Sequence, residues 1–376
     1  MKTTQTLRNL RLRPDDQQEL AALRSGKWLL YETVASEQVN IGKRTWSLRS
    51  GLTFTPYANP TRCNAHCRFC SEELQRKHQK QLTALQLITD HDRYFSALSA
   101  VLADLAGLKN LGLSLSGLEA TSDPFWLVRL LQLLQSQQGI PRFNERVLYT
   151  NGSGLHRSPD LIFLLQDLAF DRLEISRCHY KERINQRIMY INRNQAVWQN
   201  VAYEELIRKV NGRLPVKSSC ILTKPGVNDV NEMEKYLDWQ LSLGVSQVVF
   251  RELSRLDDTY IENSTKQWVE DNRVPIDGLL RTIMPDLNRQ RRNWTYLGST
   301  AGYYYYNERY RYKNTLEVNL ETSSYRALMD CNETSLVQKL VFHSNGNLCG
   351  DWDPNEQVMA NYFQEIESGM DVGLLT

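Results

Sequence analysis

Apolar and polar positions follow two periods in turn along the middle of the chain. Segments that are apolar at every second position, or almost wholly apolar, predict strands; they cover 110–117, 145–154, 171–180, 214–223 and 245–253. Segments with apolar residues at helical spacing predict helices between them; they cover 90–108, 124–139, 159–170 and 227–244, with a polar helical region at 181–211. The five or six alternations between residues 50 and 255 indicate βα units with a parallel sheet, open or closed into a barrel.

The rhythm differs on either side of this region. Residues 15–26 read as a helix, with Asp15 or Asp16 as its cap and Gly26 as its stop, and the stretch 44–58 reads as extended. Further elements are expected after residue 255: a helix within 275–290, antiparallel strands within 293–321, and a β-hairpin over 339–353 that turns at "SNGN".

We therefore predict an α/β protein in three parts. Residues 1–54 carry an N-terminal helix and an extended segment, and residues 55–255 carry the βα units. Residues 256–376 form an α+β extension that covers the barrel.

Composition is that of an ordinary globular protein. Of the 376 residues 41% are apolar and 23% charged, and the net charge of +2 gives no general attraction to nucleic acid or anionic membranes. No run of 18 apolar residues occurs, so we expect no transmembrane helix. The basic N-terminus lacks an apolar stretch of signal-peptide length, so the reducing cytoplasm is the expected compartment.

One later region is rich in tyrosine and basic residues. Residues 286–313 hold six Lys or Arg against two acids, and seven tyrosines plus Trp294. Such a mixture can mark a nucleic-acid or nucleotide surface. The favoured interpretation is a twisted antiparallel sheet whose tyrosines pack on one face, a face that could line a substrate opening.

Three cysteines lie within eight residues of "NPTRCNAHCRFCSEELQ": Cys63, Cys67 and Cys70. Clustered cysteines in a cytoplasmic protein are metal ligands or catalysts more often than disulfides. A structural zinc site would need a fourth ligand, for which His66 and His78 are candidates. A 4Fe–4S cluster normally takes four thiolates, so three would leave one iron open to a substrate or cofactor.

The C-x3-C-x2-C spacing, on a loop directly after the first strand of a βα series, resembles the radical S-adenosylmethionine (radical SAM) enzymes, and Phe69 before the third cysteine also fits that family. The resemblance covers about residues 55–255 and implies a partial (β/α)6 TIM-like barrel. It implies that the three cysteines hold one 4Fe–4S cluster whose fourth iron is chelated by S-adenosylmethionine (SAM). Reductive cleavage of SAM would give a 5′-deoxyadenosyl radical that abstracts hydrogen from the substrate, the cofactor supplying the difficult chemistry.

Further residues at successive strand ends resemble the SAM-binding positions of that family. "LSLSGLEAT", with Gly117 and Glu119, stands where the family has Gly-Gly-Glu, and departs from it by a serine in place of the first glycine and by a leucine that is either inserted or substituted. The resemblance also implies cofactor contacts at the next strand ends; the residues are Asn151 of "YTNG", Ser176 and Arg177 after "EI", and Arg251 of "VVFREL", a form similar to the molybdenum-cofactor-synthesis and peptide-modifying branch. Each of these residues could instead serve as a cap, a turn or an ion-pair partner.

The substrate is not encoded in any of these motifs. A small-molecule natural product or metabolite is the first hypothesis, and modification or crosslinking of a ribosomally made peptide is the second. The third is a zinc-stabilised binding protein without catalysis. The resemblance also implies a flavodoxin- or ferredoxin-type electron donor. The 60 or so residues before the triad are too few for a cobalamin domain.

The other four cysteines give no second cluster. Cys178 and Cys220 lie in strand-like stretches and are predicted to be buried small hydrophobes. Cys331 and Cys349 are too few for the auxiliary-cluster domain of many peptide-modifying relatives.

Overall fold

The computed structural model describes eight stretches of the chain; they are 8–10, 17–24, 35–57, 59–77, 87–136, 141–301, 305–323 and 336–365. The chain forms two compact units, each assembled from separate stretches. Unit 1 comprises residues 1–34, 65–80 and 174–330, and unit 2 comprises residues 35–64, 81–173 and 331–376. Both units take strands from the central region and from the C-terminal extension.

Strands and helices alternate through the central region as the sequence predicts. The strands are β4 (Thr53–Tyr57), β5 (Leu111–Leu115), β6 (Phe143–Thr150), β7 (Arg172–Ser176), β8 (Val216–Leu222) and β9 (Gln247–Glu252). The helices are α2 (His91–Leu105), α3 (Pro124–Ser136), α4 (Ser153–Arg157), α5 (Asp160–Asp167), α6 (Glu182–Met189), α7 (Asn200–Asn211) and α8 (Val230–Ser242). The mixed α/β class with mostly parallel strands is confirmed, and six strands match the partial (β/α)6 prediction.

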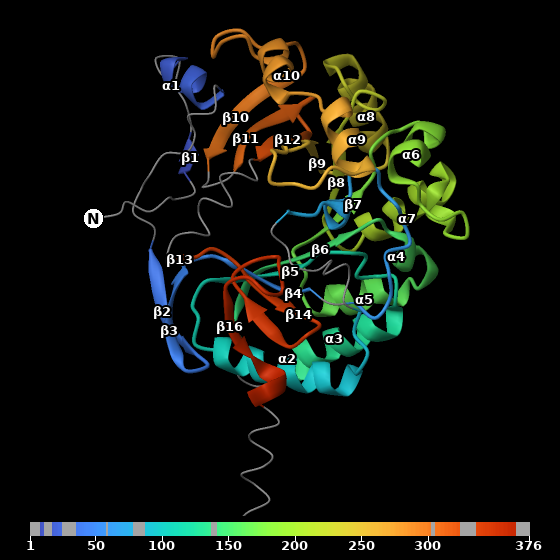
Figure 1. Cartoon of the computed structure of the whole chain (residues 1–376). Helices are drawn as coiled ribbons and strands as arrows, with labels where there is room; N and C mark the ends of the chain where they lie inside the picture. Colours follow the sequence, from blue (N-terminus) through green and yellow to red (C-terminus); the bar gives the residue numbers. More distant parts are fainter. Residues whose placement is uncertain are drawn as a thin grey trace, which may run out of the picture. The chain divides into compact units, whose positions relative to one another are not determined.

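In unit 2 the strand order is β6-β5-β4-β14-β15-β16, where the last three strands are β14 (Leu340–His343), β15 (Asn347–Cys349) and β16 (Val358–Asn361). β4 is parallel to both β5 and β14, and β14 with β15 forms the predicted hairpin. Helices α2, α3 and α5 lie together along one side of these strands (Figure 1).

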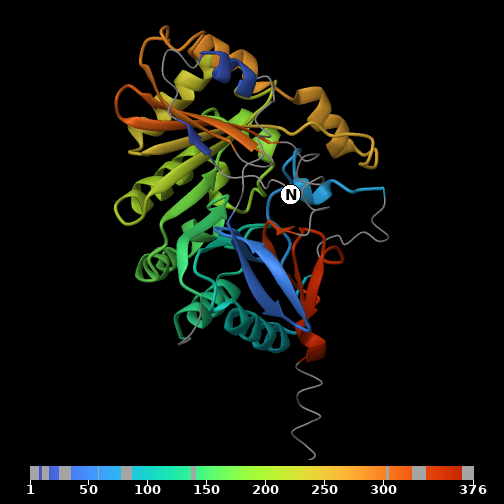
Figure 2. The same ribbon diagram turned by 90° about the vertical axis from the view of Figure 1, so that its left-hand side faces the viewer.

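A second, small sheet belongs to the same unit. It consists of β2 (Ser36–Ile41), β3 (Arg44–Arg49) and β13 (Leu336–Val337) in the order β13-β3-β2. Figure 2 shows the β2–β3 hairpin beside the C-terminal strands, and its turn residue Gly42 lies against Ala360 of β16.

In unit 1 the strand order is β1-β10-β11-β12-β9-β8-β7, with β1 (Arg8–Leu10), β10 (Trp294–Ala301), β11 (Tyr305–Tyr312) and β12 (Leu316–Ser323). β10, β11 and β12 are antiparallel, as predicted, and β12 then pairs in parallel with β9. The C-terminal extension therefore continues the sheet of the βα units.

The helices of both units bury an apolar side, and α2 of unit 2 is an example. Asp90 accepts the N–H of Arg93 and so caps the start of α2, and the helix buries Leu98, Val101 and Leu105 at helical spacing. No helix in the described stretches combines the length and the apolar character needed to span a bilayer.

Two sequence predictions need correction. The stretch 44–58 is not one extended segment, because Gly51 adopts a φ of +79° and separates β3 from β4. The helix expected within 275–290 is present as α10 (Ile276–Ile283), but α9 (Ser264–Asn272) precedes it in a stretch for which the sequence predicts no helix. α9 buries only Lys266 and Val269, so it carries almost no apolar period in the sequence.

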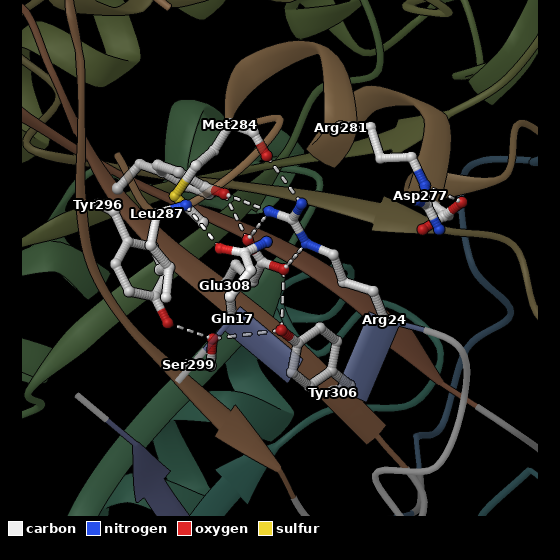
Figure 3. Close-up of polar contacts among 11 residues, drawn as sticks. Gln17, Arg24, Asp277, Arg281, Met284, Leu287, Tyr296, Ser299, Tyr306 and Glu308 are labelled. Carbon is white, nitrogen blue, oxygen red and sulfur yellow. Dashed lines mark hydrogen bonds and ion pairs between the residues drawn. The ribbon is translucent and has the colours of Figure 1, made fainter. Parts of the chain in front are cut away.

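The tyrosine-rich region is the predicted antiparallel sheet with buried tyrosines. Tyr306, Tyr310 and Tyr312 of β11 are no more than 2% exposed. Figure 3 shows Tyr306 and Glu308 turned toward Arg24, which follows α1 (Gln17–Ala22). The predicted caps of that first helix, Asp15, Asp16 and Gly26, fall outside the described residues, as do His78 and Cys331.

Candidate functional site

The loop after β5 has an unusual backbone. Gly117 and Leu118 both lie in the left-handed region, with φ of +80° and +37°. Glycine adopts this conformation freely, whereas a leucine there is strained by about 1–3 kcal/mol. A small pocket opens at this loop; it is lined by Pro56, Asn59, Leu115, Ser116, Gly117, Leu118, Ala120 and Trp126. Strained backbone beside a pocket is typical of a ligand site.

Glu119, the next residue, turns its carboxylate inward and is 2% exposed. Its Oε1 accepts from the Thr121 hydroxyl at 2.5 Å and the Thr150 hydroxyl at 2.5 Å, and its Oε2 accepts from the Asn151 backbone N–H at 2.6 Å. Burial raises the pKa of Glu119, although these donors oppose the shift. The buried carboxylate therefore links the loop after β5 to the end of β6 through hydrogen bonds.

The same network reaches the cysteine loop. The Asn151 side-chain amide donates to Asn64 Oδ1 at 2.8 Å, and Asn64 Nδ2 donates to the Ser153 hydroxyl at 2.7 Å. Asn59, before Cys63, donates to the Glu119 carbonyl at 2.8 Å. Both sides of Cys63 are thus tied to the strand ends that the family resemblance singled out.

The rest of the cysteine loop is held within unit 1. His66 N–H donates to the Tyr190 carbonyl at 3.1 Å, and Arg68 N–H donates to the Ile188 carbonyl at 3.0 Å. Cys70 N–H donates to the Cys67 carbonyl at 3.0 Å, which closes a turn between the second and third cysteines. The C-terminal turn of α6 therefore supports the backbone that carries these two cysteines.

The chemistry of the donor set fits a cluster with three protein ligands. Cys63, Cys67 and Cys70 form no disulfide within the described residues and are half-buried, so a ligand could reach each of them. Burial raises the pKa of the Cys70 thiol. Throughout the described stretches, no three His, Cys, Asp or Glu side chains are already gathered as a metal site.

Three other cysteines are buried rather than reactive. Cys178 and Cys220 are 1% and 0% exposed, which confirms their predicted burial, and Cys349 is also 0% exposed. Burial raises the pKa of all three thiols, so the thiolate is disfavoured at each position.

Two of the remaining predicted cofactor residues differ sharply in exposure. Ser176 ends β7 and is half-buried, whereas Arg177 is 0% exposed. The Arg177 guanidinium donates to the Val197 carbonyl at 2.8 Å and stands 4.8 Å from the Tyr203 ring centroid. Arg177 would have to release these contacts to pair with a cofactor carboxylate.

Arg251 and Phe69 also have protein contacts. Arg251 Nε donates to Glu321 at 3.0 Å, and its Nη1 pairs with Glu174, so Arg251 is already ion-paired with two carboxylates. The ring centroids of Phe69 and Trp268, both in unit 1, are 6.4 Å apart.

Several residues of the network were not predicted from the sequence. Asn64, Thr121, Thr150 and Ser153 bond to predicted site residues, and Gly154 must be glycine because a Cβ there would stand 1.8 Å from the Thr121 carbonyl oxygen. Their signal in the sequence is proximity alone: each lies within three residues of a predicted site residue.

No family model and no curated protein sequence matches the chain. Solved structures do. SuiB from Streptococcus suis, determined with SAM bound, is 12% identical with a TM-score of 0.46; the match covers 84% of this chain and 64% of SuiB, slightly less than two thirds. Coproporphyrinogen III oxidase (HemN) from Escherichia coli, described as a radical SAM enzyme, is 14% identical with a TM-score of 0.37, covering 69% and 67% of the two chains.

Proposed function

We propose that this chain is a radical SAM enzyme in which Cys63, Cys67 and Cys70 hold one 4Fe–4S cluster. The observation that carries the proposal is the side-chain network from Glu119 through Asn151 to Asn64, because it ties the residue after Cys63 to two successive strand ends. A capping role for Asn151 alone does not call for a bond to the cysteine loop. When bound, the cluster and SAM supply the one-electron bond cleavage described above.

The chain's own residues bind and orient. Gly117 lets the backbone approach SAM closely, and the buried Glu119 carboxylate contributes negative charge near the cofactor's ammonium and sulfonium groups. Asn151 and Asn64 hold the cysteine loop. Phe69 and Ser176 are proposed contacts of SAM; Arg177 and Arg251 join them only after exchanging their present partners.

The substrate proposed first is a small-molecule natural product or metabolite, and the reducing electron comes from a flavodoxin- or ferredoxin-type donor in the cytoplasm. A ribosomally made peptide is the alternative substrate. SuiB has been solved with its precursor peptide SuiA, and this is the reason for retaining the peptide alternative.

Anaerobic reconstitution tests the cluster. Iron and acid-labile sulfide should bind at four of each per chain. Alanine at Cys63, Cys67 or Cys70 should abolish retention of the cluster, while Cys178→Ala, a matched loss of one buried thiol, should retain it. Zinc in tetrahedral coordination with no iron would refute the enzyme and support the zinc-stabilised binding protein.

Incubation of the reconstituted protein with SAM and dithionite tests the reaction. We expect 5′-deoxyadenosine. Methylthioadenosine instead would show that another carbon–sulfur bond of SAM is cleaved, and neither product from a fully loaded protein would contradict the proposal.

A further inference from the structure

One face of the unit 1 sheet carries a row of polar side chains in which, within the described residues, three buried polar atoms lack a hydrogen-bond partner. In the pairing of β11 with β12, Arg309 lies opposite Asn319 and Asn307 lies opposite Glu321. Alternate residues of a strand point to opposite faces. Figure 3 shows Tyr306 and Glu308 of β11 on the face that meets Arg24. Asn307 and Arg309 therefore point to the other face, and their paired residues on β12 share it.

Three atoms of this row are buried and have no hydrogen-bond partner within the described residues: Asn307 Oδ1, Asn319 Oδ1 and Arg309 Nε. Asn307 is only 9% exposed. Native proteins pair nearly all buried polar atoms, so each exception needs a cause. Paired residues on neighbouring strands have Cβ atoms about 5 Å apart, and residues i and i+2 about 7 Å apart, so one small ligand could span all three.

The charges around the row balance once Lys217 is included, since its Nζ stands 4.0 Å from Glu174 Oε2. Arg309 Nη1 stands 3.8 Å from Glu317 Oε1, and Arg251 pairs with both Glu321 and Glu174. The Arg309 and Glu317 side chains are 39% and 34% exposed, so the row opens to solvent at that end. A ligand for this row needs no net charge; it needs donors for two carbonyl oxygens and an acceptor for one guanidinium N–H.

We propose that Asn307, Arg309 and Asn319 form a binding site for an uncharged amide-type edge, in which an NH₂ group with two N–H donors adjoins one acceptor. A primary carboxamide has this pattern, and so has the amino edge of adenine or cytosine. Within the proposed enzyme the site would hold part of the substrate, but the binding requires no cluster and stands apart from the radical chemistry.

Calorimetry on the full chain, without iron, tests this with matched probes: nicotinamide against nicotinate, adenosine against inosine, and cytidine against uridine. The first member of at least one pair should bind at least about tenfold more tightly, because its partner leaves an asparagine oxygen unpaired. Preference in the first pair identifies a carboxamide, and preference in the other two identifies a base edge. Equal binding, or no binding, in all three pairs overturns the proposal.

Asn319→Leu separates a ligand site from a structural role. Leucine has the same branched shape and the same number of side-chain heavy atoms, and it removes a buried oxygen that has no partner within the described residues, so the midpoint of thermal unfolding should stay or rise while the probe preference is lost. Tyr306→Phe, on the opposite face of β11, is the control: it removes a donor to Glu308 and should lower the midpoint without changing the preference. A lowered midpoint with unchanged probe binding in Asn319→Leu would refute the site.

Discussion

Glu119 and Glu308 are both nearly fully buried, with exposed fractions of 2% and 0%, yet their neighbours differ in charge. Glu308 faces a guanidinium: Arg24 donates to its two oxygens from Nε at 2.6 Å and Nη2 at 2.7 Å, and the Tyr306 hydroxyl donates at 2.8 Å. Among the described residues, Glu119 receives only uncharged donors, which are the hydroxyls of Thr121 and Thr150 and the backbone N–H groups of Thr121 and Asn151.

Glu308 has its counter-charge within the protein, in Arg24, whereas Glu119 has no cationic partner among the described residues. Burial acts to lower the pKa of Arg24, but the hydrogen bond and charge of Glu308 outweigh it and raise that pKa. Within the described residues no lysine, arginine or histidine forms an ion pair with Glu119. A buried carboxylate without a cation is costly unless it is protonated or a ligand brings the cation. This is why we place the positively charged cofactor near Glu119.

The largest expected effect on stability is at the Arg24–Glu308 ion pair. Arg24→Leu leaves the Glu308 carboxylate buried without its cation and should lower the free energy of unfolding by about 3–5 kcal/mol. The double variant Arg24→Leu/Glu308→Gln should recover part of the loss, because no unpaired charge remains. Denaturant unfolding measures both. A single-variant loss no larger than that of an exposed ion pair, about 1 kcal/mol or less, would show that the pair is not buried in solution.

A smaller effect on stability and a larger one on function are expected at Glu119. Glu119→Gln keeps the shape but turns an NH₂ group toward existing donors, which should cost about 1–3 kcal/mol. Formation of 5′-deoxyadenosine should fall much more steeply, because the negative charge near SAM is gone. Asp286→Asn is a suitable control, since that carboxylate is ion-paired with Arg289 on the surface. Full activity in Glu119→Gln would remove Glu119 from the proposed site.

The helices and strands of the central region could be predicted from the sequence because, in each of them, apolar residues recur at the spacing of a helix or a strand. α2 and β9, for example, are recognisable from apolar spacing alone, and both lie where predicted. α9 could not be found in this way, since it buries almost nothing apolar. β14 and β12 could be predicted as strands from their own residues. Their parallel pairing with β4 and β9 could not, because it depends on contacts between residues far apart in the sequence.

The candidate site was predictable only where chemistry demands a rare residue pattern. Three cysteines at close spacing are such a pattern; a buried glutamate held by two threonines is not. The family resemblance implies that Glu119 is a SAM-binding residue, and in the structure its carboxylate bonds to Thr121, Thr150 and Asn151. Side-chain direction follows from packing around a strained loop, and no local pattern encodes it.

A third prediction concerns the link between Glu119 and the cysteine loop. Asn64→Ala and Ser153→Ala should each lower the free energy of unfolding by about 0.5–1.5 kcal/mol, and the two losses should not add, because the residues share one hydrogen bond. Asn64→Ala should also reduce the iron retained per chain, since the residue after Cys63 is released. Asn144→Ala, which removes an exposed asparagine pair with Asn110, is the control. Strictly additive losses with unchanged iron would break the proposed link.

The smallest effect is a dependence of stability on pH, and it distinguishes the two glutamates most finely. Burial raises the pKa of Glu119 in the folded protein above its unfolded value. The folded state then binds its proton more readily, so the contribution of Glu119 to stability is full below the ordinary carboxyl pKa and is lost as pH rises through the raised one. Unfolding measured across this range should show that slope in the wild type and not in Glu119→Gln. A saturating amount of SAM should flatten the wild-type slope, because its ammonium favours the ionised carboxylate and so lowers the folded pKa. A slope unchanged by SAM would mean that the missing cation is not the cofactor, even if the cluster itself were present.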